Sequence, residues 1–304
     1  MFDINSNCWD SQLLKLLNIP EKILPQVCDC AHDFGETKLF GGSIKIGGIA
    51  GDQQAALIGQ RCFNSGEAKS TYGTGCFLLL NTGTKKLNSS NKLLSTIAYR
   101  VNGETTYGLE GSIFMAGAAV QWIRDGLKFF KNANETEEIV KHRNADSKVL
   151  VVPAFTGLGA PHWDPNARGS IFGITRDTNI ADLTAATLES IAFQTKDLIE
   201  AMQKDGGSFS ELRVDGGMVV NDWFSQQLSN ILNLNVVRPK VIETTALGAA
   251  YLASLNAGLC EDLGSLNHNW NSDKKFVPEK EKTTDLSLRY ETWLSAVERT
   301  KGLF

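Results

Sequence analysis

The order of strand-like and helix-like segments between residues 66 and 258 most constrains how this chain folds. Two β-hairpins are predicted first, at residues 67–81 and 95–109, because β-prone runs flank the turns Gly73-Thr74-Gly75 and Asn102-Gly103. After the hairpins, helical and strand patterns alternate. Antiparallel strands followed by strand–helix units predict an α/β protein, with a mixed sheet flanked by helices.

The later segments follow from periodicity and turn residues. The predicted elements are a helix at 115–130, strands at 149–153 and 170–175, a helix at 182–204, a strand at 211–215, a helix at 221–234, a strand at 236–238 and a helix at 245–257. This order resembles the ribonuclease H-like or actin-like type of ATPase domain. A plain dinucleotide-binding fold would alternate from the start, and no G-x-G-x-x-G follows the first strand.

Both ends of the chain are patterned more weakly than its middle. Asp10 is expected to cap a helix at 11–17, and a strand at 43–46 runs into a glycine-rich turn and a helix at 52–60. The tail after Gly258 is polar and predicts little regular structure.

Composition argues against several classes of function. The 304 residues carry a net charge of −4 without a dense Lys/Arg stripe, so no nucleic acid partner is expected. No apolar segment approaches membrane-spanning length, so no membrane association is expected. Six cysteines without a C-x-x-C pair favour free thiols and a cytoplasmic location. The cluster Cys28-Asp29-Cys30-Ala31-His32 lacks a second ligand pair, so no metal site is predicted.

A strand, a glycine turn and a helix start meet near residue 215. Asp215-Gly216-Gly217 follows the strand-like run 212–214, and Asn221 opens an amphipathic helix. Glycines have no Cβ to block a ligand, and a helix N-terminus offers unpaired N–H groups. Because such turns are common in α/β proteins, the motif alone predicts a nucleotide contact only weakly.

Asp52 follows a turn with three glycines and begins a predicted helix. Asp at this position suits either a helix N-cap or a carboxylate that accepts a proton from an alcohol, and the residues alone favour the cap. Gln53 beside it can donate a hydrogen bond to a hydroxyl, or can lie exposed in the first helical turn.

Two further glycine sites suit either packing or phosphate binding. Thr74 lies in a hairpin turn whose glycines predict positive φ, and its hydroxyl can hold a phosphate. Gly117 and Gln121 are one helical turn apart, where a small residue serves helix packing as well as a ligand. His162 lies between prolines and is interpreted as structural. Neither a Walker A sequence nor a G-x-S-x-G occurs.

Longer motifs carry a resemblance to a known family. The run from Gly169 to Glu189, G-x-I-x-G-I followed after seven residues by D-L-x-x-A-T-L-E, is similar to the C-terminal signature of the FGGY family of carbohydrate kinases. The segments that also resemble this family, in the same order along the chain, are 48–57, 71–77, 155–161 and 243–250. The resemblance covers essentially the whole chain.

This resemblance implies a reaction and a set of site residues. The reaction is phosphoryl transfer from Mg-ATP to a terminal hydroxyl of glycerol, giving sn-glycerol 3-phosphate, with ATP or ADP and Mg²⁺ at the site. Asp52 is implied as the catalytic base, and Asp52, Gln53 and Phe77 as the glycerol-binding residues. The implied contacts of ATP or ADP are Thr74, Gly117, Gln121, Gly217 and Asn221.

The resemblance also implies that most of the family's first domain is absent from this sequence. Residues 1–59 are expected to be the last segment of that domain, with the hinge and the catalytic Asp, and residues 60–304 the C-terminal, nucleotide-binding domain with a polar tail. Three functions stay open: a glycerol-phosphorylating enzyme, a kinase of another sugar such as xylulose or gluconate, and a non-catalytic nucleotide-binding fragment that exposes apolar surface at 44–60. A homo-oligomer is also left open.

Overall fold

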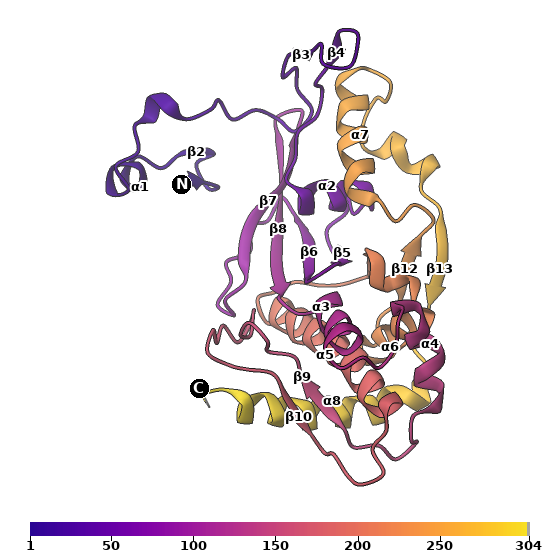
Figure 1. The fold of residues 1–304 in the computed structure, drawn as a ribbon. Coiled ribbons are helices and arrows are strands. Elements are labelled where there is room, and N and C mark those ends of the chain that lie inside the picture. The colour runs from indigo at the N-terminus through magenta and orange to yellow at the C-terminus, as the bar shows by residue number, and fades with distance from the viewer. Residues whose placement is uncertain (303–304) are drawn as a thin grey trace.

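A mixed sheet of seven strands forms the centre of the molecule (Figure 1). The computed structural model describes residues 1–302, apart from the side chains of residues 267–269. Strand β11 runs parallel to both β5 and β12, and the other neighbouring strands are antiparallel. In their order across the sheet, the strands are β13 (Ser272–Phe276), β12 (Val236–Pro239), β11 (Glu211–Asp215), β5 (Glu67–Tyr72), β6 (Cys76–Gly83), β8 (Glu104–Ile113) and β7 (Leu94–Val101).

The two predicted hairpins are present, but their turns differ. Asn102 and Gly103 have φ of 53° and 79°, and a type I′ turn requires positive φ at both positions. Gly73 and Gly75 do not adopt positive φ, so that part of the prediction is wrong. Gly75 instead permits close approach, because a Cβ there would lie 2.6 Å from the carbonyl oxygen of Ile113.

Helices α2 (Asp52–Gly59) and α7 (Thr244–Asn256) lie together over one face of the sheet (Figure 1). Leu57 of α2 is fully buried in one apolar cluster with Leu79 of β6. Helix α2 therefore packs into the same core as this strand.

Glycines bring the backbones of α2 and α7 into direct contact. A Cβ at Gly59 would lie 1.9 Å from the carbonyl oxygen of Thr244, and a Cβ at Gly248 would lie 1.8 Å from that of Ala55. Any larger residue at either position forces the two helices apart.

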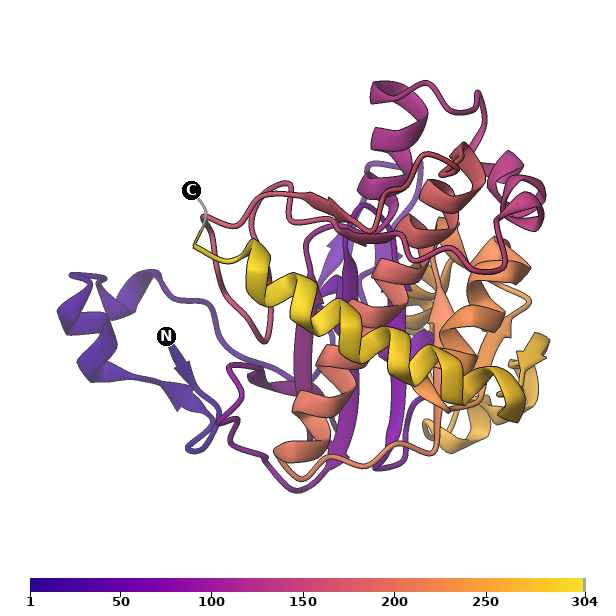
Figure 2. The ribbon, with the colours of Figure 1, turned by 90° about the horizontal axis from the view of Figure 1, so that it is seen from below.

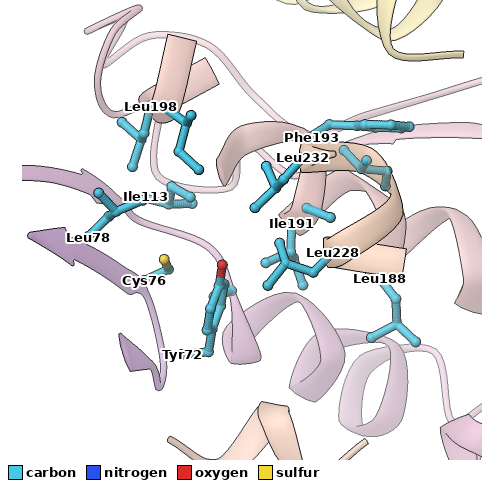
Figure 3. Packing of buried hydrophobic residues seen from close by; sticks show 14 of the residues in the cluster. Tyr72, Cys76, Leu78, Ile113, Leu188, Ile191, Phe193, Leu198, Leu228 and Leu232 are labelled. Atoms are coloured by element: carbon cyan, nitrogen blue, oxygen red, sulfur yellow. The ribbon is translucent and has the colours of Figure 1, made fainter. Parts of the chain in front are cut away.

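Helices α5 (Ile180–Lys204) and α6 (Asp222–Leu232) cover the opposite face, and α8 (Lys280–Thr300) crosses over them (Figure 2). Figure 3 shows residues of β5 and β6 facing those of α5 and α6 in this core. Within residues 1–302, no helix is long and apolar enough to cross a membrane.

The expectation of little regular structure after Gly258 is wrong for residues 272–300. Strand β13 extends the sheet beside β12, and α8 contributes buried side chains to the main core. Tyr290, Trp293 and Val297 are each at most 1% exposed. Their spacing of three and four residues is helical, but charged neighbours hide it in the sequence.

The helix predicted at 115–130 is also shorter than predicted. Helix α3 (Gly117–Gln121) passes into a π-helical turn, η2 (Trp122–Gly126), and Lys128 then has a φ of 61°, which ends the helix. Leu127, which lies within the predicted helix, is 39% exposed. The remaining elements after the hairpins are η3 (Ala133–Glu135), α4 (Thr136–Ile139), η4 (Val140–His142), β9 (Leu150–Val152), β10 (Ser170–Phe172), η5 (Gly217–Val220) and η6 (Gly264–Asn269).

An arm formed by the first residues extends away from the sheet (Figure 1). Asp10 caps α1 as predicted, because its side chain accepts hydrogen bonds from the backbone N–H groups of Gln12 and Leu13. The elements of the arm are β1 (Phe2–Asp3), β2 (Cys8–Trp9), α1 (Ser11–Leu16), η1 (Glu21–Ile23), β3 (Glu36–Thr37) and β4 (Ile44–Lys45).

The apolar surface expected at residues 44–60 is exposed only in its first part. Ile44, Ile46 and Ile49 are exposed, whereas Leu57 and Ile58 are fully buried. The second part is covered by α7 and the sheet.

Candidate nucleotide and acceptor site

A cavity of about 510 Å³ opens beside the hairpin of β5 and β6. It is bounded by that hairpin, by α3 and by η5. All five residues predicted to contact ATP or ADP line it, namely Thr74, Gly117, Gln121, Gly217 and Asn221. The fold thus gathers residues from three distant parts of the sequence, and their role as nucleotide contacts stays a prediction. A second cavity, of about 740 Å³ between residues 143–148 and α8, contains none of the predicted site residues.

The hairpin is docked on the first turn of α3. The carbonyl of Gly73 accepts a hydrogen bond from the N–H of Gly117 at 2.9 Å, and the carbonyl of Thr74 accepts from Ala116 and Ala118 at 3.0 Å. A Cβ at Gly117 would lie 2.5 Å from the carbonyl oxygen of Gly73. Gly117 therefore allows approach of the hairpin backbone, rather than the helix packing considered from the sequence.

Gly216 and Gly217 serve different purposes in the turn after β11. Gly216 has a φ of 91°, and a Cβ there would lie 2.4 Å from the carbonyl oxygen of Tyr72, so this glycine holds the turn against β5. A Cβ at Gly217 would have no atom within 4 Å. Gly217 is therefore the position where the backbone stays open to a ligand in the cavity.

Asn221, where the sequence predicts the start of a helix, is the N-cap of α6. Its Oδ1 accepts a hydrogen bond from the N–H of Phe224 at 2.8 Å, and its Nδ2 donates to Oγ1 of Thr136 at 3.0 Å. A side-chain amide carries two donor hydrogens, so one of them remains for a ligand.

Other residues that line the cavity were not found from the sequence. Arg124 follows Gln121 by three residues, and residues three or four apart share a helix face, as Gly117 and Gln121 do, so this rule was sufficient to find it. The polar segment around Thr136 carried no comparable signal. The further lining residues are Tyr72, Gly73, Val120, Arg124, Ala133, Asn134, Thr136, Glu137, Leu188, Met218 and Val220.

Asp52 is the first residue of α2 and is exposed. The N-cap is Gly51, so the hypothesis that Asp52 caps the helix is wrong. Its Oδ1 accepts a hydrogen bond from the N–H of Gln53 at 2.8 Å, and its Oδ2 accepts from Nε2 of Gln53 at 3.2 Å. Further lone pairs on the carboxylate remain to accept a proton from an alcohol.

A buried lysine that the sequence reasoning did not select lies beneath this pair. Lys69 in β5 is 0% exposed, and its Nζ donates to Oε1 of Gln53, to Oγ1 of Thr71 at 3.1 Å and to the carbonyl of Phe77 at 3.3 Å. Burial lowers the pKa of Lys69, and the negative charge of Asp215 opposes that shift.

Asp215 and Phe77 complete this side of the sheet. Asp215 is 1% exposed and accepts hydrogen bonds from Nε2 of Gln60 at 2.8 Å and Oγ1 of Thr244 at 2.6 Å, so it ties α2 and α7 to β11. Phe77 is directly opposite Thr71 across β5 and β6, and its side chain is 38% exposed. Its partial exposure leaves an apolar surface on the strand that follows the hairpin turn.

Among the residues that the structure describes, no group of three or more His, Cys, Asp or Glu side chains could hold a metal ion. His162 makes a hydrogen bond from Nε2 to Oδ2 of Asp197 at 2.8 Å, and Asp197 also accepts from the hydroxyl of Tyr290 at 2.6 Å. This contact holds the proline-rich loop against α5 and α8.

Comparison with known proteins identifies the family. A model of the C-terminal domain of the FGGY family of carbohydrate kinases matches residues 68–257. The chain belongs to the FGGY family of carbohydrate kinases. All residues that line the cavity fall in the matched range, so the cavity lies within the FGGY domain.

Relatives of this FGGY chain include proteins named glycerol kinase. The one from Alteromonas mediterranea is 55% identical over 303 residues, and the one from Marinomonas sp. is 54% identical over 302 residues. Each match covers 99% of this chain and 61% of the relative. The chain therefore spans about 61% of the length of these relatives.

Solved structures confirm the fold. The glycerol kinase of Plasmodium falciparum, solved with ADP, is 38% identical with a TM-score of 0.89, over 98% of this chain and 61% of that one. A xylulose kinase of Lactobacillus acidophilus matches with a TM-score of 0.86 at 23% identity, over 98% of this chain and 62% of that one. At this identity, the match supports the fold and nothing further. The predicted ribonuclease H-like or actin-like α/β class is confirmed.

Proposed function

We propose that this chain belongs to an enzyme that transfers a phosphoryl group from ATP to a terminal hydroxyl of glycerol. The product is sn-glycerol 3-phosphate, and this reaction is the first step of glycerol catabolism. One observation carries the proposal: the predicted nucleotide residues and the predicted glycerol residues flank the same hairpin, with Thr74 in the cavity and Phe77 on the strand that follows. The relatives named glycerol kinase support glycerol as the acceptor.

The residues around the cavity suit ATP or ADP. A volume of about 510 Å³ lies in the range of small-ligand sites. Gly217 leaves its backbone open, and Thr74 and Asn221 offer hydrogen-bond donors to the ligand. Mg²⁺ enters as part of the Mg-ATP substrate, because this ion is usually held by phosphates with only one or two carboxylates. When bound, it neutralises charge on the phosphates.

The acceptor residues suit an alcohol. Asp52 accepts the proton of the attacking hydroxyl, since its carboxylate is exposed and keeps free lone pairs. Gln53 Nε2 holds one Asp52 oxygen and keeps a second hydrogen for the acceptor, and Phe77 offers an apolar wall. Most of the rate enhancement then comes from positioning and from excluding water.

The organisation of the whole protein is part of the proposal. We propose that residues 1–59 end the first domain of the family and carry its hinge and base, and that residues 60–304 form the second, nucleotide-binding domain. The first domain would supply the other wall of the cleft. The six unpaired cysteines support a cytoplasmic location as part of this proposal, and a homo-oligomer is left open.

The test measures ADP release from Mg-ATP with glycerol, xylulose and gluconate as acceptors. It uses both the 304-residue chain and the longest protein that its gene encodes. We expect kcat/KM for glycerol to exceed kcat/KM for xylulose and for gluconate by about 10²-fold or more, since a site that hydrogen-bonds its substrate discriminates strongly.

The alternatives predict different results. Faster turnover of xylulose or gluconate than of glycerol would favour another FGGY sugar kinase. Binding of ADP with no turnover of any acceptor, in both forms of the protein, would favour a catalytically dead nucleotide-binding fragment.

A further inference from the structure

We infer that Lys69 is a positioning residue of the acceptor site, which fixes the side-chain orientation of Gln53 and thereby the hydrogen bonding of Asp52. The inference rests on the proposed function, because it concerns the same acceptor site. It adds a residue that touches neither the nucleotide cavity nor the solvent.

The surroundings of Lys69 use every hydrogen of its ammonium group. Its three donors meet three acceptors: Oε1 of Gln53, Oγ1 of Thr71 and the carbonyl of Phe77. A buried cation without such partners would be strongly destabilising. Because no donor is left and the side chain is 0% exposed, Lys69 does not itself contact a substrate.

The charge of Lys69 decides which way the amide of Gln53 points. An ammonium only donates, so it selects Oε1 of Gln53 as the acceptor and turns Nε2 toward Oδ2 of Asp52, at 3.2 Å. The opposite orientation would place two donors together at Lys69 and two acceptors together at Asp52. The lysine therefore ensures that Gln53 presents a donor to the carboxylate and to the acceptor hydroxyl.

The third hydrogen bond links this arrangement to the hairpin. Phe77 follows Gly75 by two residues, and its carbonyl is held by the same ammonium that holds Gln53. Lys69 thus connects the start of α2 with the strand that leaves the nucleotide-binding turn. In the described part of the chain, no other residue makes hydrogen bonds to both the Gln53 side chain and the Phe77 carbonyl.

Ionisable groups on four neighbouring elements act on the charge of Lys69, three of them from its own face of the sheet and Cys76 from the other. These are Asp52 on α2, Cys76 on β6, Glu110 on β8 and Asp215 on β11, all of which favour the protonated amine. Burial has the larger, opposite effect and lowers the pKa of Lys69 below its ordinary value of 10.5. Alkaline pH should therefore remove the orienting charge earlier than it would for an exposed lysine.

The first test reads the orientation of Gln53 directly and does not depend on turnover. It compares the side-chain amide ¹⁵N–¹H signals of Gln53 in the wild type, in Lys69→Met and in the control Ser70→Ala. Ser70 is equally buried in the same strand but bonds to Cys76 on the opposite face. We expect these signals to shift in Lys69→Met alone. Unchanged signals in Lys69→Met would overturn the inference, whatever the protein phosphorylates.

The second test measures kinetics in the complete protein with Mg-ATP and glycerol. We expect kcat of Lys69→Met to fall by about 10²-fold, the usual effect of a small misplacement, with KM for ATP nearly unchanged. The wild-type kcat should also decline at alkaline pH below 10.5, and the variant should lack this decline. An equal loss of activity in Ser70→Ala and Lys69→Met would reduce Lys69 to a structural role.

A third variant guards against misfolding of Lys69→Met. Gln53→Glu keeps an acceptor for Lys69 but offers no donor to Asp52, so we expect a stable protein with kcat lowered about 10²-fold or more. Full activity of a folded Gln53→Glu would contradict the inference. If the wild type phosphorylates no acceptor, the proposed function fails, and the amide signals alone still decide the role of Lys69.

Discussion

Gly248→Ala is expected to weaken the contact between α2 and α7. A Cβ at this position would lie 1.8 Å from the carbonyl oxygen of Ala55, far inside ordinary van der Waals contact. The obstacle is backbone, so no side-chain rotation relieves it, and the two helices must separate. Overpacking of this kind costs up to ~3 kcal/mol, whereas replacing glycine by alanine inside a helix returns about 1 kcal/mol. The expected net loss of unfolding free energy is about 2 kcal/mol.

Thermal unfolding of the purified chain measures this loss. A change of about 2 kcal/mol lowers Tm by roughly 4–8 °C in proteins slightly shorter than this one. Gly42→Ala is the matched control, because a Cβ there meets no atom within 4 Å, and its Tm should stay within about 1 °C of the wild type. The affinity for ADP should stay nearly unchanged in both variants, since neither α2 nor α7 lines the cavity.

The outcome distinguishes tight from loose packing at this position. A Tm of Gly248→Ala equal to or above that of the wild type would show that the helices tolerate a methyl group between them. The inference that the backbones of α2 and α7 are in direct contact at Gly248 would then be wrong.

Four further outcomes follow from the structure. Asp52→Asn should lower kcat by about 10²–10⁴-fold, the usual contribution of a general base, and calorimetry should show a nearly unchanged affinity for ADP. Retained turnover in this variant would exclude Asp52 as the base. Gly217→Val should weaken ADP binding about tenfold or more without lowering Tm, because its side chain would enter open cavity space; equal affinity would place the nucleotide elsewhere. Trp293→Ala should cost about 3–5 kcal/mol in a denaturant titration, since the side chain is fully buried and donates to a backbone carbonyl; a loss below about 1 kcal/mol would contradict its place in the core. Burial raises the pKa of the Cys62 thiol to about 12 and that of the Cys76 thiol to about 11. Iodoacetamide at pH 8 should therefore label both cysteines in the unfolded chain and neither in the native protein, and mass spectrometry measures the labelling.

Local patterns were sufficient to predict the hairpins and the strand–helix units. The dipeptide Asn102-Gly103 is enough to predict a turn with positive φ at both residues, and Asn221 caps the helix that the sequence placed after it. Such features depend on neighbouring residues, so a single sequence shows them. The resemblance to FGGY kinases identified five residues as nucleotide contacts, and the structure shows that all five line one cavity.

Features set by distant contacts could not be predicted in the same way. Lys69 reads as an ordinary exposed lysine in a strand, and it is buried only because β11 and β6 flank β5 and α2 covers it. Trp293 and Tyr290 lie in a helix whose charged residues conceal its apolar side. The end of the helix near Lys128 depends on a π-helical turn, which periodicity does not reveal.

The direct backbone contact of α2 with α7 also limits how the site can move. Because Gly59 and Gly248 leave no space between the helices, α2 is held against α7, and Leu57 packs it onto the sheet that carries the hairpin of β5 and β6. The separation between the Asp52 carboxylate and the turn at Thr74 is then set when the protein folds, not when a ligand arrives. Any hinge within residues 1–59 would therefore lie before α2, and conformational changes would carry Asp52 and Thr74 together as one body.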